Sequence, residues 1–556
     1  MRIVGISPSH DSSVCVYNDG EIEYFFKEER LCGIKKESKP YLAMIEAQKT
    51  LMGPVDLCVI ASPDGRSIFS VDLLAERLFK CPVIDMDEYH HMSHAALAFE
   101  NSGFDEALIF VADRNGSKIG GVCRESETVM VARRDPYTFT EIYKNYWSDY
   151  SSHQIQEVLE YLKQVRPETK HIVRSKFNAT MVYESATTLI GEHPLENGKT
   201  MGLSAYGHPE GFPDLFVNCL DSDVFLVPHD SYFDLDNYAR SHVKPVMNRE
   251  LNEYATNEVT FEDTLHADYA KHVQNQTQEE VFKCIDYYST KTGIKNIIVT
   301  GGYGMNIVTN SYLVQLMPEC KFWFEPIADD TGNSIGACIY SYKNETGDTN
   351  KYPLKDTFFH GYDYDLGDVY LSINEGSDRH YDTSGIADLL DNDKSVAVYY
   401  GKAEAGQRAL GNRSILFNAF NPSAKDIVNE IKKREWYRPF AAIILEEDAK
   451  TCFDMLYLER NEFMTNSFQI KEEWRLTFQG IVHEDGSCRI QTVREGHLLY
   501  ELLTEIKSRR GIGILLNTSF NLAGEPLVET PDEALRTLHG SNLDYVWFPS
   551  YNLVAK

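Results

Sequence analysis

Two histidines four residues apart, His90 and His94, form the first pattern in the sequence that could carry chemistry. Residues i and i+4 of a helix lie on one face, so both imidazoles could bind the same metal ion. The alternative is a pair of helix histidines that touch solvent or the edge of a core. His91 lies off the shared face and is predicted to have a structural or supporting role. The spacing alone leaves both interpretations open.

Acidic residues at the ends of predicted elements favour the metal. Asp113 ends the apolar strand predicted at residues 106–113, and Asp329 and Asp330 precede a glycine-containing helix start. Carboxylates at strand ends converge on the crevice of an open α/β sheet. Two imidazoles and two carboxylates make a mixed nitrogen and oxygen donor set, which suits iron, zinc or manganese better than calcium or magnesium.

The elements that must position these residues alternate along the chain. A hairpin is predicted around an Asn-Asp-Gly turn, between apolar segments at 13–18 and 21–26. Helical patterns separate the later strands, for example at 277–293. Strands that alternate with helices indicate an α/β fold.

A polar segment with glycine and proline, residues 344–353, predicts a domain boundary. The chain has 556 residues, which exceeds the usual size of a single hydrophobic core. We therefore expect one domain over residues 1–350 and a second α/β domain over residues 351–556.

The composition limits the classes of partner. Acidic residues outnumber basic ones by 84 to 54, and the resulting net charge of −30 disfavours a broad basic face for polymeric nucleic acid. No apolar stretch is long enough to cross a bilayer, and the N-terminus is typical of a strand rather than a signal peptide. We expect a cytoplasmic protein without a membrane partner. Eleven scattered cysteines without a CxxC pair predict reduced thiols.

Two glycine-rich motifs could approach a nucleotide. In "VTGGYGMN", Gly301, Gly302 and Gly304 would expose backbone N–H groups at the end of a strand, with Asn306 beside them. The alternative is a tight turn without a ligand. In "NGKTMGLSAYG", Lys199 could meet a phosphate or lie in a solvated loop.

The C-terminal region gathers cations inside an acidic protein. Arginine forms bidentate contacts with phosphate, so these motifs could compensate several negative charges. For any one cation the alternative is a surface ion pair, above all for Lys433 and Arg434, which adjoin Glu430 and Glu435. The motifs are "GQRALGNRS" with Arg408 and Arg413, "IKKREWYRPF" with Lys432 and Arg438, and "HEDGSCRIQ" with His483 and Arg489.

Ten motifs in a fixed order resemble the O-carbamoyltransferase family of nodulation proteins and antibiotic-tailoring enzymes. The resemblance implies an actin-like N-terminal domain, which is a duplicated ribonuclease H-like fold, and a YrdC-like α/β C-terminal domain. The motifs are "GISPSHDSSVCVYNDGEI" followed by "KEER", "HHMSHA", "VADRNG", "NGKTMGLSAYG", "TGGYGMNIVTN", "DDTGNSIGA", "EAGQRALGNRSIL", "IKKREWYRPFA", "VHEDGSCRIQTV" and "LLNTSFNLAGEPLVETP".

The resemblance also implies a reaction and its cofactors. The C-terminal domain would join carbamoyl phosphate and ATP, with Mg²⁺ accompanying the ATP, into carbamoyl adenylate and release pyrophosphate. The N-terminal domain would transfer the carbamoyl group to an acceptor hydroxyl and release AMP. The family's iron, Fe(II) or another divalent metal here, would be held by His90, His94, Asp113 and Asp330, with Asp329 the less favoured ligand.

Catalytic roles are predicted at His10 and Asp11 and, by the resemblance, at Lys432 and Arg489. Lys432, Arg489 and Ser519 would contact carbamoyl phosphate and the adenylate. Asp11, next to His10, could orient or deprotonate the acceptor hydroxyl, although an Asx turn explains an aspartate in such a polar tip equally well. Further nucleotide or carbamoyl contacts are predicted at Lys199, Gly301, Gly302, Gly304, Asn306, Arg408, Arg413, Arg438, His483, Asn517 and Asn521.

The acceptor is expected to be a small molecule with a hydroxyl group: a sugar, a natural product, or a hydroxymethylpyrimidine as a nucleotide or in modified DNA. Abundant tyrosine (33 residues) with Asn- and Lys-rich stretches favours an AT-rich bacterial or phage gene. A gene of that kind favours a hydroxymethylpyrimidine as the acceptor. A homodimer is also expected. The alternatives are carbamoylation of a protein thiol, a tRNA-directed reaction, and a non-catalytic nucleotide-binding module.

Overall fold

The computed structural model describes residues 1–63, 70–148, 152–175, 178–217, 223–229, 265–352, 358–367 and 381–556. The chain divides into two compact units. The first holds almost all described residues up to Tyr352, and the second holds those from Phe358 onward. Within the described part of the chain, no helix is long and apolar enough to cross a membrane.

The first sheet of the first unit has the strand order β3-β2-β1-β4-β5. β1 pairs antiparallel with β2 and parallel with β4, and β2 and β3 form the predicted hairpin. Strands β1, β2 and β4 are buried along nearly their whole length, because both faces of the sheet are covered. The bounds are β1 (Arg2–Ser7), β2 (Ser13–Asn18), β3 (Glu21–Lys27), β4 (Leu57–Ile60) and β5 (Val83–Asp85).

The second sheet repeats this topology. Its order is β10-β9-β8-β6-β11-β12, with β6 antiparallel to β8 and parallel to β11. Its strands β9-β8-β6-β11-β12 have the order 3-2-1-4-5 of the first sheet, with β10 added beside β9 and β7 paired to β8. Two successive sheets of this order make the duplicated, actin-like arrangement that the resemblance implies. The bounds are β6 (Glu106–Ala112), β7 (Lys118–Ile119), β8 (Cys123–Arg133), β9 (Thr138–Ser148), β10 (Lys170–Ser175), β11 (Asn296–Thr300) and β12 (Lys321–Phe324).

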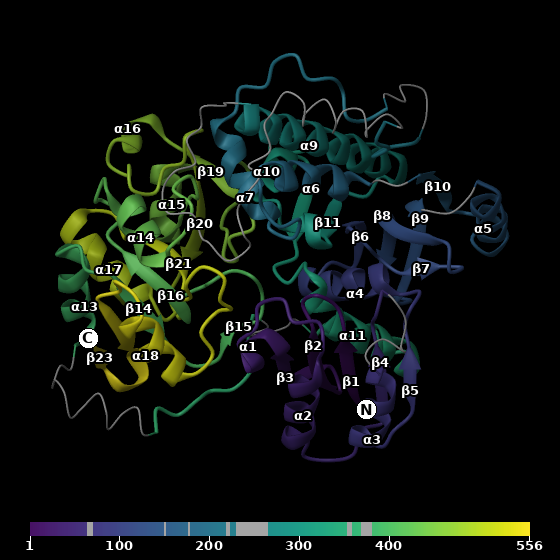
Figure 1. Ribbon diagram of the computed structural model, residues 1–556, viewed down its shortest axis with the longest axis horizontal. Coiled ribbons are helices and arrows are strands. Elements are labelled where there is room, and N and C mark those ends of the chain that lie inside the picture. The colour runs from purple at the N-terminus through teal and green to yellow at the C-terminus, as the bar shows by residue number, and fades with distance from the viewer. Residues whose placement is uncertain are drawn as a thin grey trace. The chain divides into compact units, whose positions relative to one another are not determined.

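Two helices of the first unit lie between these sheets (Figure 1). α4 (His90–Ser102) contacts β6 and β11, whereas α11 (Asn333–Thr346) contacts β1 and β2, and the two helices pack on each other. A Cβ on Gly336 of α11 would lie 1.9 Å from the carbonyl oxygen of Ser93 in α4. Only glycine permits this close crossing, which brings the ends of both helices together.

The other helices of the first unit surround the two sheets, and the helix predicted at 277–293 is the C-terminal part of α9. They are α1 (Glu28–Cys32), α2 (Tyr41–Thr50), α3 (Val71–Phe79), α5 (Ser152–Val165), α6 (Ala179–Leu189), α7 (Asn197–Leu203), η2 (Ser204–Tyr206), α9 (Leu265–Thr292), η3 (Gly302–Met305), α10 (Ile307–Leu316) and η4 (Asp330–Gly332).

The second unit is built on one mixed nine-stranded sheet, of order β18-β19-β20-β17-β21-β16-β14-β22-β23. Apolar clusters cover both faces of the sheet. Its strands are β14 (Val396–Tyr399), β16 (Arg413–Phe417), β17 (Ala441–Leu445), β18 (Phe453–Asp454), β19 (Ser467–Ile470), β20 (Ser487–Val493), β21 (Ile514–Ser519), β22 (Tyr545–Phe548) and β23 (Leu553–Ala555), with β13 (Phe359–His360) and β15 (Ala403–Glu404) paired separately.

The helices of the second unit include α18, which begins with the predicted Thr-Pro signal. Thr530 and Glu533 form a reciprocal capping box there. The helices are α13 (Thr383–Asp391), α14 (Ala424–Lys432), α15 (Glu446–Cys452), α16 (Glu472–Arg475), α17 (Tyr500–Arg510), α18 (Pro531–His539) and η5 (Pro549–Tyr551).

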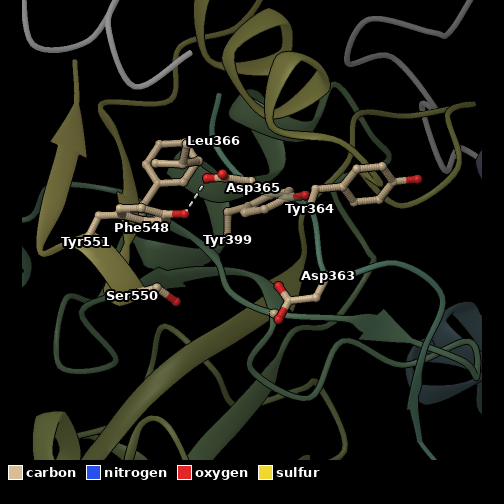
Figure 2. Close-up of a pocket in the computed structure, with 9 residues that line it drawn as sticks. Asp363, Tyr364, Asp365, Leu366, Tyr399, Phe548, Ser550 and Tyr551 are labelled. Atoms are coloured by element: carbon tan, nitrogen blue, oxygen red, sulfur yellow. Dashed lines mark hydrogen bonds between the residues drawn. The ribbon is translucent and has the colours of Figure 1, made fainter. Parts of the chain in front are cut away.

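A pocket of about 280 Å³ lies beside β14 and β22 of the second unit. Aromatic and acidic side chains line it, and among them Tyr551 donates a hydrogen bond to Asp365 at 2.7 Å (Figure 2). The pocket contains none of the site residues that the sequence predicts.

Candidate metal centre and anion site

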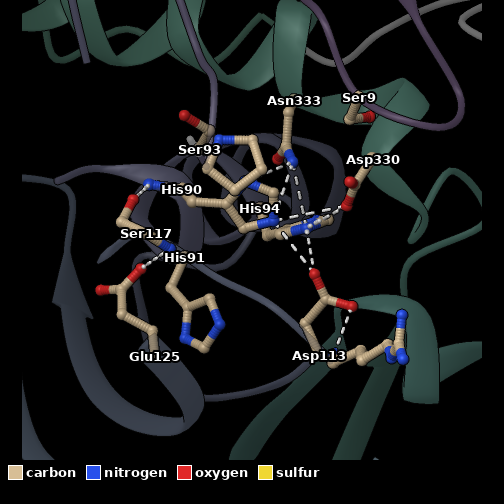
Figure 3. A network of polar contacts seen from close by, with 12 residues as sticks. Ser9, His90, His91, Ser93, His94, Asp113, Ser117, Glu125, Asp330 and Asn333 are labelled. Atoms are coloured by element: carbon tan, nitrogen blue, oxygen red, sulfur yellow. Dashed lines mark hydrogen bonds and ion pairs between the residues drawn. The ribbon is translucent and has the colours of Figure 1, made fainter. Parts of the chain in front are cut away.

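The four predicted metal ligands converge in the first unit. One ligand atom from each of His90, His94, Asp113 and Asp330 lies within 4.8 Å of the other three. His90 Nε2 is 3.0 Å from Asp113 Oδ2 and 3.3 Å from Asp330 Oδ1, and all four side chains are buried (Figure 3). The helical spacing of the histidines therefore does place both rings on one face.

Three separate elements position this cluster. The histidines form the first turns of α4, Asp113 follows the last residue of β6, and Asp330 begins η4 just before α11. Asn333, the first residue of α11, donates its Nδ2 group toward His94 Nε2 at 3.1 Å. Asp330 rather than Asp329 belongs to the cluster.

Charges of both signs compensate each other in this cluster. Burial pulls the pKa of His90 down, but the carboxylates of Asp330 and Asp113 outweigh burial and raise it to about 10. Burial pushes the pKa of Asp330 up, yet the charge on His90 and hydrogen bonds from both histidines bring it well below its ordinary value. A divalent cation would replace the histidine protons as the partner of the two carboxylates.

The donor set fits a transition metal. Two imidazole nitrogens and two carboxylate oxygens match the preference of iron, zinc or manganese. The Asn333 Oδ1 and His94 Nδ1 atoms are buried without a hydrogen-bond partner in the described part of the chain. Unsatisfied buried polar atoms next to four converging donors are typical of a site built around a ligand.

His10 and Asp11 lie next to this cluster. His10 is 3.1 Å from Asp11 Oδ2 and 3.6 Å from Asp330 Oδ2, so the two predicted catalytic residues adjoin a metal ligand. Burial opposes the charge on His10, but the hydrogen bond to Asp11 and the charge of Asp330 raise its pKa to about 9. Asp11 Oδ1 is buried and has no hydrogen-bond partner among the described residues.

The glycine motif after β11 lies beside the same strand end. Gly301 has φ +81°, and a Cβ there would lie 2.4 Å from the carbonyl oxygen of Ala112. A Cβ on Gly302 would lie 3.2 Å from Asp113 Oδ1, and Gly304 follows within η3. Glycines at these positions let the ends of β6 and β11 approach each other next to Asp113.

Two predicted nucleotide contacts have protein partners instead. Asn306 caps α10, where its side chain accepts hydrogen bonds from the N–H groups of Val308 and Thr309. Lys199 Nζ lies 2.7 Å from the carboxylates of both Glu192 and Glu196. These contacts favour structural roles for Asn306 and Lys199.

In the second unit, Lys432 is the centre of a network of predicted site residues. It ends α14 and is buried, and its Nζ donates to the carbonyl and side-chain oxygens of both Ser519 and Asn521, at 2.5 to 3.2 Å. Ser519 in turn donates to Asn521 Oδ1 at 2.7 Å. Residues 87 positions apart in sequence thus meet at the end of β21.

Further cations surround this network. Burial, followed by the charges of Arg434 and Arg438, lowers the pKa of Lys432 well below its ordinary value. Burial and the charges of Arg408 and Arg438 do the same to Arg489 on β20, whose Nε has no hydrogen-bond partner among the described residues. We call Lys432, Arg434, Arg438, Arg408 and Arg489 the cationic cluster.

Arg434 is not placed for a surface ion pair, and Arg413 is not placed for binding a phosphate. Arg434 is stacked over the ring of Phe440, 4.0 Å from its centroid, and donates to Asn429 Oδ1. Arg413 is fully buried, is stacked on Tyr399, and donates to five backbone carbonyl groups. Those contacts favour a structural role for Arg413.

The last two predicted contacts lie near the same strands. Asn517 of β21 is buried and donates to the carbonyl of Ala409 and to Gln491 Oε1, both at 3.3 Å. His483 is buried in the turn before β20, where its backbone N–H bonds the carbonyl of Ser487.

The sequence interpretation missed Asn333, Arg114 and Glu184. Asn333 lies three residues after Asp330, so one helical turn brings its side chain close to that predicted ligand. Arg114 directly follows a predicted ligand, and its Nε lies 2.8 Å from Glu184. Burial, only partly offset by the charge on Arg114, raises the pKa of Glu184 to about 7. Glu184 lies 70 residues away in a helical pattern, so no local signal marks it.

Fold and site together define a two-unit α/β protein with a buried metal-ligand cluster and a separate cationic cluster. Two family models match it: "Carbamoyltransferase N-terminus" over residues 66–339 and "Carbamoyltransferase C-terminus" over residues 387–555. The chain belongs to the carbamoyltransferase family.

Two curated proteins and one solved structure are similar to the chain. The chain is 29% identical to nodulation protein NolNO of Sinorhizobium fredii over 83% of its own length and 63% of that protein's length. It is 25% identical to an uncharacterised protein of Methanocaldococcus jannaschii over 100% of its own length and 99% of that protein's. A crystal structure of full-length HypF in a phosphate- and nucleotide-bound form is similar at 14% identity with a TM-score of 0.39, covering 63% of this chain and 56% of that one.

Proposed function

We propose that this carbamoyltransferase forms carbamoyl adenylate from carbamoyl phosphate and ATP, and then transfers the carbamoyl group to a hydroxyl. The observation that carries the proposal is the cationic cluster around Lys432. Burial and, after it, the charges of neighbouring cations lower the pKa of Lys432, Arg434 and Arg489, so the cluster gathers positive charge in a buried place. Substrates that bring several phosphates together supply the missing negative charge.

The first half of the reaction has a defined balance. Carbamoyl adenylate keeps only the carbamate of carbamoyl phosphate, so water must release inorganic phosphate. A carbamate oxygen then attacks the α-phosphorus of ATP, and pyrophosphate leaves with the bonding electron pair. Lys432 and Arg489 neutralise charge on the phosphoryl oxygens, while Ser519 and Asn521 fix the position of the Lys432 ammonium group.

The second half takes place at the cluster of the first unit. Asp11 Oδ1, which has no partner among the described residues, accepts the proton of the acceptor hydroxyl. The hydroxyl oxygen attacks the carbamoyl carbon, and AMP leaves with the electrons of the broken carbon–oxygen bond. His10 holds Asp11 in place through the 3.1 Å contact. A divalent metal such as iron, when bound by His90, His94, Asp113 and Asp330, supplies Lewis-acid polarisation of the carbamoyl oxygen.

For the acceptor we favour a hydroxymethylpyrimidine nucleotide. The tyrosine-rich composition is typical of an AT-rich gene, which supports this acceptor over a sugar or an antibiotic core. The net charge of −30 favours a free nucleotide over DNA as the form of the acceptor.

The experiment is to incubate the protein with ATP and carbamoyl phosphate and to measure inorganic phosphate, pyrophosphate and AMP. Pyrophosphate release that requires carbamoyl phosphate is the expected result. A mass increase of the acceptor by one carbamoyl group then identifies the hydroxyl. No pyrophosphate with or without acceptors would contradict the proposal and favour a nucleotide-binding module.

A further inference from the structure

Arg114 is a cation fixed at the rim of the metal-ligand cluster. It follows the predicted ligand Asp113, and its N–H donates to Asp113 Oδ1 at 2.8 Å. Its carbonyl accepts hydrogen bonds from Trp147 Nε1 at 3.2 Å and from Asn178 Nδ2 at 2.8 Å. Side chains from β9 and from the start of α6 therefore hold the backbone of Arg114 in one place.

The guanidinium group is also held, but only from one side. Its Nε lies 2.8 Å from Glu184 Oε2, and Glu184 is 7% exposed whereas the Arg114 side chain is 42% exposed. In the described part of the chain, the two Nη groups of Arg114 make no hydrogen bond. A buried carboxylate thus holds the Nε edge of a half-exposed guanidinium, and its two Nη groups remain as donors.

An anion that enters this site needs such a cation. Asp11, Asp113, Asp330 and Glu184 gather four carboxyl groups around His10 and the metal ligands. A phosphate group would be repelled by these carboxylates unless a fixed cation compensated its charge. The guanidinium fork of arginine matches the geometry of two phosphoryl oxygens.

We propose that Arg114, anchored by Glu184, binds a phosphoryl group of a substrate at the metal-ligand cluster. This inference deepens the proposed function and rests on it. The phosphoryl group has two chemical sources: a phosphate monoester on the acceptor, as in a nucleoside monophosphate, or the phosphate of the adenylate. In either case the Nη groups donate to the phosphoryl oxygens, and no covalent step takes place at Arg114.

The test compares wild-type protein with two variants at the pair. Arg114→Gln combined with Glu184→Gln removes both charges, so no buried carboxylate is left without its partner. Arg114→Lys keeps the charge but loses the two-pronged donor. Arg133→Gln is the matched control, because Arg133 forms an exposed pair with Glu106 at the same distance of 2.8 Å on the far end of β6 and β8.

Binding is measured by calorimetry with 5-hydroxymethyl-2′-deoxycytidine, with its 5′-monophosphate, and with AMP. For an acceptor phosphate, wild type and Arg133→Gln bind the monophosphate about 10- to 100-fold tighter than the nucleoside, and the double variant loses this difference. For the adenylate phosphate, the double variant instead weakens AMP binding by a similar factor. Arg114→Lys should retain part of either effect. Unchanged binding of both phosphates by a folded double variant would overturn the proposal.

The proposed function and this inference can be contradicted by different results. If wild type binds the phosphate compounds through Arg114 but releases no pyrophosphate from ATP and carbamoyl phosphate, the phosphoryl site stands and the carbamoyl-adenylate reaction does not.

Discussion

The metal-ligand cluster of the first unit and the cationic cluster of the second are both buried and charged, but their charges are organised in opposite ways. His90 and Asp330 shift each other's pKa toward the charged form, so this cluster compensates itself. Lys432, Arg434 and Arg489 have pKa values lowered by burial and by neighbouring cations, among which Arg438 acts on all three. An uncompensated buried charge is costly. The sign of the charge that a cluster leaves uncompensated therefore indicates whether its ligand is a cation or an anion. The first cluster suits a cation that replaces protons, and the second suits an anion.

The largest effect is expected from removing the central charge of the cationic cluster. Lys432→Met should lower carbamoyl-phosphate-dependent pyrophosphate release about 100- to 1000-fold, because a preorganised donor in a site shielded from water is lost. Lys433→Met is the matched control, since Lys433 is the next residue but is exposed. Pyrophosphate release is measured for both. Equal loss in the two variants, or none in Lys432→Met, would break the distinction between a built anion site and a general basic surface.

Removing a ligand from the first unit should abolish tight metal binding. His94→Ala and Asp330→Asn should each weaken binding by more than about 100-fold, which exceeds the usual effect of changing a residue that only supports a ligand. Metal content after purification and titration of the metal-free protein with Fe(II) or Zn²⁺ measure this loss. Asp329→Asn is the control, because Asp329 lies outside the cluster. Metal retained by Asp330→Asn but lost from Asp329→Asn would exchange the roles of the two aspartates, and metal retained by His94→Ala would contradict the histidine ligand.

The structure brings together the four donor side chains that the sequence pattern and the resemblance predict as metal ligands. Helical periodicity places His90 and His94 on one face, Asp113 follows a strand end, and Asp330 lies directly before a helix. The duplicated fold was predicted by resemblance, and the strand orders of both sheets agree with it.

Contacts set by register and burial were beyond the sequence pattern. Arg413 and Arg489 read alike in sequence, but the pairing of β14 and β16 places Arg413 opposite Tyr399, on which it is stacked. Arg434 adjoins Glu435, which favours a surface pair, yet the structure places it over Phe440.

Asn306, in contrast, immediately precedes α10, a position that favours a helix cap. That signal was available from the sequence and predicts its observed hydrogen bonds.

A smaller effect is expected when pyrophosphate binds to the cationic cluster and stabilises the folded protein. Pyrophosphate at about 100 times its dissociation constant should stabilise wild type by about 2.7 kcal/mol, seen as a rise in Tm. Arg438→Gln should raise the Tm of the ligand-free protein slightly, because it removes one of the mutually repelling cations, and should reduce the rise caused by pyrophosphate. His94→Ala should keep the full pyrophosphate effect, since it lies in the other unit. A lower ligand-free Tm in Arg438→Gln would show that its pair with Glu435 outweighs the repulsion.

The smallest effect concerns pH, and its sign follows from Lys432. Its pKa in the folded protein lies well below the ordinary 10.5 because burial and the neighbouring arginines oppose its charge. Below the folded pKa, both folded and unfolded chains carry the proton. Between that pKa and 10.5, the unfolded chain binds more protons, so this group makes the ligand-free protein more stable as pH rises.

The slope from this single group is at most about 1.4 kcal/mol per pH unit. Over the same window, pyrophosphate affinity should fall, because a neutral amine does not attract an anion. Arg434 and Arg489, whose pKa values are lowered in the same direction, remain in the Lys432→Met variant, so the difference between wild type and variant isolates the contribution of Lys432. Denaturant unfolding and pyrophosphate binding, measured from pH 7 to 10, should therefore change in opposite directions in wild type, and the Lys432→Met variant should lose both components. If stability and affinity fall together in wild type, the ammonium group of Lys432 is compensated within the protein, and the contrast with the metal-ligand cluster disappears.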